Sequence, residues 1–280
     1  MNVTRERRFA PAAANIRKHF TTLLILAAVV PLLSGSLCAQ GGGGGRGGRG
    51  GGGRGGPPPT AKASAPIDIT GYWEALITRD WRYRMLNPPK GDYQGLPLNA
   101  EARKVADEWD PAKDEAAGEQ CRSYGAVNIM RMPGRLHITW ADDETLKIET
   151  DAGKQTRMLY FGPPKGEGGD WQGISKASWD TIPGVGRFGQ AAPPVQTGAL
   201  KVVTTKMKPG YLRRNGVPYS ANAVMTEYFD LVKEGDSDSY LIITTTVDDP
   251  MYLTTPYLTS TNFKKQGDAT GWNPMPCSSR

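Results

Sequence analysis

Two side chains of this chain have the chemistry of a general acid and base. Glu227 falls on the apolar face of a predicted strand, and a carboxylate in such surroundings has a raised pKa unless a cation or hydrogen bonds keep it ionised. His137 is the one histidine outside residues 1–39, and it lies on another predicted strand. Glu227 is interpreted in two ways: as half of a buried ion pair with Arg157, or as an acid, base or ligand-orienting group in a cavity. Glu227 and His137 are therefore candidate catalytic residues, and neither is assigned a role.

A set of aromatic side chains has the composition of a small-molecule pocket, in which apolar rings supply contact area and polar tips orient the ligand. Arg157, Glu227 and His137 would add polar anchors to it. The same aromatic residues also build ordinary β-sheet cores, so both interpretations stay open. The residues predicted to bind the ligand are Trp73, Trp140, Arg157, Tyr160, Trp171, Tyr228 and Glu227.

Metal and cofactor chemistry is not expected from the sequence. One histidine cannot form a histidine cluster for a metal, and the cysteine and histidine spacing of zinc sites is missing. The sequence also has no phosphate-binding loop, no dinucleotide fingerprint and no Gly-x-Ser-x-Gly elbow. We predict no metal and no cofactor.

The candidate residues are expected on short β-strands. Between positions 127 and 161 the chain reads as four strands joined by tight turns, which is typical of an antiparallel meander. One helix is expected to begin at the cap Asn99 and to be stopped by Pro111. The strands are predicted at 67–77, 127–132, 135–140, 145–150, 155–161, 171–179, 199–207, 222–232, 239–247 and 256–264.

A sheet of this size can close into a barrel, which removes exposed strand edges and can enclose a cavity. No βαβ alternation is present, so parallel strand pairs are not expected. Residues 208–220 are expected to form a loop that is dense in hydrogen-bonding groups and could gate the mouth of a barrel. The Gly- and Pro-rich segment 181–198 is expected to be another loop.

Three cysteines are present in the chain. Cys38 is expected to leave with an export signal, which leaves Cys121 and Cys277 as an even pair in an exported protein. We predict a disulfide between them that ties the end of the chain to the domain.

The first 39 residues have the features of a signal peptide. A basic start precedes an apolar run at 20–33, which is too short for a comfortable membrane span, and Ala39 offers a cleavage site. Acylation of Cys38 is the alternative. We predict a signal peptide at 1–39, a disordered Gly/Arg/Pro-rich linker at 40–66 and a β-barrel domain at 67–280. The mature protein is expected to be periplasmic or secreted.

The net charge of +6 is concentrated outside the predicted domain. The chain has 34 Lys and Arg against 28 Asp and Glu; removing the five basic residues and one Glu of 1–39 leaves +2, and removing the three arginines of 41–56 leaves −1. A nearly neutral domain gives no reason to expect nucleic acid as a partner. The Gly/Arg tract is interpreted as a flexible tether, with weak contact to an anionic envelope surface as a further possibility.

Two resemblances support an exported barrel. Gly71-Tyr72-Trp73 resembles the Gly-x-Trp motif that opens lipocalins and related calycin barrels, which bind small apolar ligands. From Asp68 to Cys277 the chain is also similar to exported bacterial proteins of unassigned function, which implies an exported β-barrel and no catalytic residue. The wider resemblance is carried by 68–73, Cys121, 132–135, Trp179, 204–205, 216–220, 226–229, 247–250, 254–256 and Cys277.

The predicted fold class is all-β: an antiparallel meander that closes into a lipocalin-like β-barrel with one short helix. The predicted function is an exported barrel that binds a small, largely apolar molecule in its lumen. Two alternatives stay open: a hydrolase or isomerase that uses Glu227 and His137 in that cavity, and a cell-envelope interaction module without a ligand cavity. A filled interior would favour the interaction module.

Overall fold

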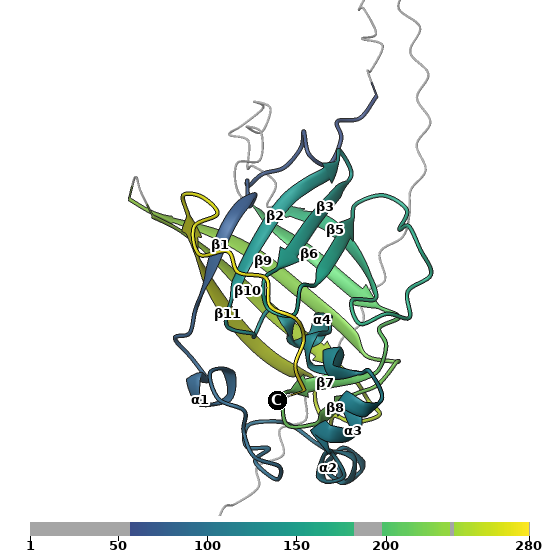
Figure 1. The fold of residues 1–280 in the computed structure, drawn as a ribbon. Helices are drawn as coiled ribbons and strands as arrows, with labels where there is room; N and C mark the ends of the chain where they lie inside the picture. The colour runs from purple at the N-terminus through teal and green to yellow at the C-terminus, as the bar shows by residue number, and fades with distance from the viewer. Residues whose placement is uncertain (1–56, 182–197, 236–237, 280) are drawn as a thin grey trace, which may run out of the picture. The chain divides into compact units, whose positions relative to one another are not determined.

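A computed structural model describes residues 57–181, 198–235 and 238–279. The expected signal peptide, residues 40–56 of the expected linker and nearly all of the loop predicted at 181–198 lie outside the described residues. Within the described ranges, nine strands form a closed barrel in the order β1-β11-β10-β9-β6-β5-β4-β3-β2 (Figure 1). They are β1 (Gly71–Leu76), β2 (Arg135–Asp142), β3 (Thr145–Thr150), β4 (Thr156–Tyr160), β5 (Ile174–Thr181), β6 (Gly198–Thr205), β9 (Val224–Glu234), β10 (Asp238–Asp248) and β11 (Tyr257–Gln266).

The all-β prediction is confirmed, because each barrel strand overlaps a predicted strand. The first strand closes the barrel, since Trp73 is paired with Lys265 of β11 on one side and with Leu136 of β2 on the other. A closed barrel has no free strand edge, and it is compatible with the lipocalin-like expectation. Lipocalin barrels have eight strands, and this one has nine.

The strand predicted at 127–132 is wrong. These residues lie in and after the short helix α4 (Ala126–Ile129), and all of them are buried. The segment mixes apolar residues with Asn128 and Arg131, and a pattern of so few residues does not separate a strand from a buried helix. The helix begins at Gly125, and the Asn128 side chain donates a 2.9 Å hydrogen bond to the Ser123 carbonyl.

One pair of neighbouring strands is parallel, against the expectation of antiparallel pairs throughout. The strands β4 and β5 pair through Leu159 with Ser175 and through Tyr160 with Lys176. Parallel strands need a crossover of about a dozen residues or more, and residues 161–173 supply it.

Several short helices replace the single helix that was predicted. Asn99 caps α2 as expected, because its side chain accepts a hydrogen bond from Ala102 N at 2.9 Å. Pro111 does not stop the helical segment but begins the next helix, where a missing N–H has no cost. The helices in the described ranges are α1 (Trp81–Arg84), α2 (Ala100–Asp107), α3 (Pro111–Ala116), the 3₁₀-helix η1 (Gln120–Tyr124) and α4.

The barrel interior is filled with side chains. Trp73, Phe229 and Phe263 are at most 1% exposed, and they belong to one continuous apolar cluster with Leu and Ile residues of the surrounding strands. Ile129 and Met132, from α4 and the residues after it, belong to the same cluster and close one end of the barrel.

A second apolar cluster lies at the end of the barrel that carries the helices. Figure 1 shows α2 and α3 there beside a hairpin of β7 (Gly210–Arg213) and β8 (Val217–Tyr219). Ala102 and Ala106 of α2 share this cluster with Val217 and Tyr219 of the hairpin. Residues 208–220, which were predicted as a loop, therefore contain a hairpin that packs against the helices.

The described part of the expected linker, residues 57–66, lies against the barrel. Ala61 N donates to Glu144 Oε1 at 3.0 Å, and Trp179 Nε1 donates to the Ala61 carbonyl at 2.8 Å. Trp179 also packs against Trp140 and Phe161, so this segment lies on an aromatic group of the barrel.

The predicted disulfide is confirmed. Cys121 and Cys277 are bonded at 2.01 Å, and the bond joins η1 to the C-terminal segment across a separation of 156 residues.

Among the helices in the described part of the chain, none is long and apolar enough to cross a membrane.

Candidate functional site

Glu227 lies in the barrel interior as half of an ion pair with Arg157. Arg157 Nη2 is 2.7 Å from Glu227 Oε2 and Nη1 is 3.3 Å from Oε1, and the two side chains are 1% and 0% exposed. Arg157 Nη2 also lies 3.3 Å from Thr204 Oγ1 and 3.5 Å from Ser175 Oγ. In this fork geometry each carboxylate oxygen accepts a hydrogen bond from Arg157. Of the two interpretations of Glu227, the structure therefore shows the buried ion pair.

His137 lies on the outer face of the barrel. Its ring stacks on Tyr72 with centroids 4.1 Å apart, and its Nδ1 is 3.3 Å from Glu149 Oε2. Its strand neighbours Leu136 and Ile138 point into the interior cluster, so His137 points away from it. The structure therefore does not bring His137 and Glu227 together.

The predicted aromatic residues are divided between the two faces of the sheet. Trp73 is fully buried in the interior and donates from Nε1 to the Ile69 carbonyl at 2.9 Å, and Trp140 packs against the same cluster. Tyr160 and Tyr228 alternate with the buried residues of β4 and β9, so they face outward. Trp171 precedes β5 and has the ammonium group of Lys208 4.3 Å above its ring.

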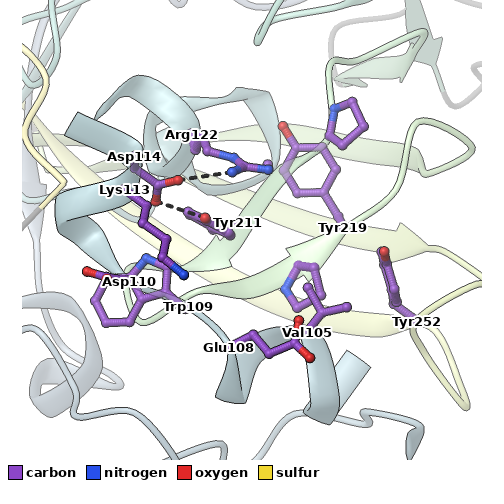
Figure 2. A pocket seen from close by; sticks show the side chains of 13 residues that line it. Val105, Glu108, Trp109, Asp110, Lys113, Asp114, Arg122, Tyr211, Tyr219 and Tyr252 are labelled. Atoms are coloured by element: carbon purple, nitrogen blue, oxygen red, sulfur yellow. Dashed lines mark hydrogen bonds and ion pairs between the residues drawn. The ribbon is translucent and has the colours of Figure 1, made fainter. Parts of the chain in front are cut away.

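A pocket of about 260 Å³ lies at the helical end of the barrel, among α2, α3, η1 and the β7–β8 hairpin (Figure 2). The sequence did not point to it, because its walls come from six separate segments. The only local signal was the density of hydrogen-bonding groups in 208–220. Its lining includes Val105, Glu108, Trp109, Lys113, Asp114, Arg122, Tyr211, Tyr219 and Tyr252.

Asp114 organises one wall of the pocket. Its carboxylate is 6% exposed and accepts from Arg122 Nη1 at 3.0 Å and from the Tyr211 hydroxyl at 2.8 Å (Figure 2). Burial raises the pKa of Tyr211, and the hydrogen bond to Asp114 raises it further, so Tyr211 stays a neutral donor. Asp114 therefore holds the guanidinium and the phenol in fixed positions.

Trp109 forms another wall, and the hairpin turn decides how closely it approaches. Gly216 has a φ of +81°, and a Cβ atom at this position would collide with Cβ and Cγ of Trp109. Only glycine combines this backbone conformation with this contact at no steric cost. The turn of the hairpin therefore packs directly on the indole.

The hydroxyl group of Tyr219 is a polar group of the pocket that has no hydrogen-bond partner among the described residues. The side chain of Tyr219 is buried. Two glycines leave room for that hydroxyl, since a Cβ atom on Gly125 would lie 2.5 Å from it and one on Gly210 would lie 2.8 Å from it. Arg122 Nε is a second buried donor for which the described residues supply no acceptor.

The unpaired groups define what the pocket can do chemically. Burial raises the pKa of Tyr219, so its hydroxyl is protonated and can donate. An unpaired buried donor costs about 1–3 kcal/mol. Both donors have almost no exposed surface, so an acceptor in the pocket reaches them only when the side chains around them shift, and it then recovers that energy. The aromatic walls offer ring surface to the rest of a ligand.

No group of His, Cys, Asp and Glu in the described ranges is arranged to hold a metal ion.

Comparison with protein-family models, with curated proteins and with solved structures found no match to this chain. The function is therefore argued from the geometry of the pocket.

Proposed function

We propose that this protein is an exported β-barrel that binds a small organic molecule in the pocket at its helical end. The observation that carries the proposal is the pairing of open volume with an unpaired buried hydroxyl, that of Tyr219. Buried polar groups without partners are rare in folded proteins, and they cluster where a water or ligand is missing. The basic and apolar start of the chain supports export, and the disulfide is compatible with an oxidising compartment.

This proposal moves the ligand from the lumen to the barrel end. The lumen is occupied by the apolar cluster and by the Arg157–Glu227 pair. The pocket of about 260 Å³ is slightly below the range of about 300–1,000 Å³ that is usual for ligand pockets, so the ligand is expected to be small. A single aromatic ring that bears a carbonyl or carboxylate oxygen matches the aromatic walls and the two free donors.

Saturation-transfer NMR with benzamide, benzoate and toluene as probes tests the proposal. The Tyr219→Phe variant removes the free donor, and a typical hydrogen bond of about 1 kcal/mol predicts roughly five-fold weaker binding of benzamide or benzoate. Toluene, which has no acceptor, should bind the variant and the wild-type protein alike. Because the Tyr219 hydroxyl has no partner in the described chain, the substitution should not lower the free energy of unfolding.

Tyr228→Phe is the matched control, since this tyrosine faces outward from the barrel. It should leave the binding of every probe unchanged. Equal binding of benzamide and benzoate by the wild-type protein and by Tyr219→Phe would contradict the proposal. So would a ligand found among the interior residues in a crystal of protein purified from its own envelope.

The two alternative functions are affected differently by the geometry. A hydrolase or isomerase that pairs Glu227 with His137 has no support from the structure, because the two side chains face opposite sides of the sheet. Two observations favour an envelope interaction module: the barrel interior is filled, and large apolar side chains are exposed near α1. Trp81, Met85 and Leu86, in and after α1, are 63%, 55% and 56% exposed. A protein that binds none of the probes would favour this second candidate.

A further inference from the structure

Three arginines are buried together on another part of the barrel end. Arg84 of α1, Arg131 after α4 and Arg213 of β7 are 3%, 5% and 5% exposed. Arginine is almost never buried in this way unless an acidic partner is present, because moving a charge out of water costs several kcal/mol.

The hydrogen bonds of the three guanidinium groups go almost entirely to neutral acceptors. Arg84 Nε donates to the Arg131 carbonyl at 2.9 Å, and Arg131 Nη1 donates to Thr259 Oγ1 at 2.5 Å. Arg213 donates to the carbonyls of Asp92 and Gln94 at 3.3 and 3.1 Å. Each guanidinium has five N–H donors, so most donors in the cluster are not used by these bonds.

One carboxylate is in ion-pair contact with the cluster among the described residues. Asp80 Oδ2 lies 3.3 Å from Arg131 Nη2, and the Asp80 side chain is 46% exposed. Three buried positive charges therefore face a single, half-solvated negative charge. Arg213 is also held flat against the Tyr83 ring, with its Cζ 4.0 Å from the ring centroid, which stabilises a guanidinium but does not neutralise it.

The charges of the three arginines act on one another. Burial, followed by the charge of Arg131, lowers the pKa of Arg84 to about 10. Burial also lowers the pKa of Arg213, which has Arg131, Tyr257 and Asp80 as electrostatic neighbours in common with Arg84. A pKa of about 10 keeps Arg84 protonated at neutral pH, so its positive charge persists.

Arg84 supplies an unpaired donor, and a hollow borders two side chains that contact Arg131. Arg84 Nη2 is buried and has no hydrogen-bond partner within the described part of the chain. A hollow of about 160 Å³ is bordered by Asp80 and Thr259, the two side chains that hold the Arg131 guanidinium, and by Arg79 and Ser260. The hollow is larger than the roughly 10–15 Å³ that one water needs, so it can hold several waters or a small ion.

We propose that Arg84, Arg131 and Arg213 form a binding site for an oxyanion, either a free phosphate-type ion or the anionic group of a larger ligand. The anion supplies the negative charge that the cluster lacks, and it accepts hydrogen bonds from the unused N–H donors. Arginine is suited to this role because its planar fork matches the oxygens of phosphate and carboxylate groups. The site is lined by other residues than the pocket in Figure 2, and it does not depend on the proposed function.

Thermal unfolding of the full-length protein in phosphate, sulfate, acetate and chloride at constant ionic strength tests the site. An anion present at about 100 times its Kd should raise Tm by several degrees relative to chloride. A rise that saturates with phosphate and sulfate alone identifies a bound tetrahedral oxyanion, since stabilisation by excluded salts does not saturate, and a saturating rise with acetate as well identifies a carboxylate group. Equal Tm values in all four anions would overturn the proposal.

The Arg84→Gln variant locates the effect. It should lose at least half of the anion-dependent rise in Tm, whereas Arg82→Gln should keep it, because the Arg82 side chain is 56% exposed on the same helix. An unchanged rise in Arg84→Gln would contradict the assignment. If Arg84→Gln does not fold, NMR of the arginine Nε–H groups of the wild-type protein decides: the signals of Arg84, Arg131 and Arg213 should shift on addition of phosphate, and unchanged signals would overturn the site.

Discussion

At the scale of single residues, the Arg157–Glu227 pair shows how a buried charge is tolerated in this barrel. Removing each ion from water costs several kcal/mol, and the two short contacts between the guanidinium and the carboxylate offset that cost. The hydroxyls of Ser175 and Thr204, which lie 2.8 Å apart, add polar partners from β5 and β6. Together these side chains link four consecutive strands of the barrel, β4, β5, β6 and β9.

Removing one partner should cost far more than removing both. Glu227→Gln leaves a buried guanidinium without its counter-ion, and we expect a loss of about 3–5 kcal/mol in the free energy of unfolding by urea titration. The double variant Arg157→Met/Glu227→Leu should recover most of that loss. Glu149→Gln on the outer face serves as the control and should stay within about 1 kcal/mol of the wild-type protein. A Glu227→Gln variant as stable as this control would contradict the interpretation.

At the scale of elements, the helical end depends on packing and not on the helices themselves. None of the described helices is longer than the eight residues of α2, and helices of this length are marginal in water without tertiary contacts. Two contacts hold this end in place: the turn at Gly216 against Trp109, and the bond between Cys121 of η1 and Cys277. The pocket lies between these elements, so its shape depends on both contacts.

The contact between Gly216 and Trp109 can be tested by adding one methyl group. Gly216→Ala should displace Trp109 and lower the free energy of unfolding by about 2–4 kcal/mol, the sum of backbone strain and a steric collision. Gly235→Ala is the matched control, because Gly235 has a φ of +63° and a Cβ atom there meets nothing within 4 Å. In a hydrogen-exchange experiment, the backbone amides of α2 should exchange faster in Gly216→Ala than in the wild-type protein. In Gly235→Ala their exchange rates should be unchanged. Equal exchange in the two variants would contradict the role of this contact.

At the scale of the whole molecule, closure of the barrel and the disulfide act together. The pairing of β1 with both β2 and β11 brings the start and the end of the domain side by side. The disulfide then fixes the last residues to η1, across a separation of 156 residues. A bond that closes so long a loop restricts the unfolded chain more than a short one does.

Export and the disulfide give one joint prediction. Protein produced with its leader is expected to begin at Gln40 by mass spectrometry and to contain an oxidised Cys121–Cys277 bond. The Cys121→Ser/Cys277→Ser variant should be less stable by up to about 5 kcal/mol in urea. Wild-type protein treated with a reductant is the control and should match the variant. A mature chain that retains residues 1–39, or a variant with unchanged stability, would contradict the corresponding half of the prediction.

Local patterns predicted the strands well where one face is buried and the other is not. The strand Thr145–Thr150 has the predicted bounds, and β2, β9 and β10 differ by at most a few residues at an end. The same reasoning failed at 127–132, because Asn128 and Arg131 are buried there as well, so their polarity does not mark a solvent-facing side. The pocket was missed for a different reason: its residues extend from Val105 to Tyr252, and no short segment contains enough of them to form a pattern.

The sequence alone determined the all-β class, the pairing of Cys121 with Cys277 and the candidate ion pair, because each depends on residue type and on local alternation. Only the tertiary structure decided that β4 and β5 run parallel, that His137 faces outward, and that a pocket forms among the helices and the β7–β8 hairpin. These features depend on how the sheet closes and on what packs across its end. Such contacts join residues far apart in the chain, so no local pattern specifies them.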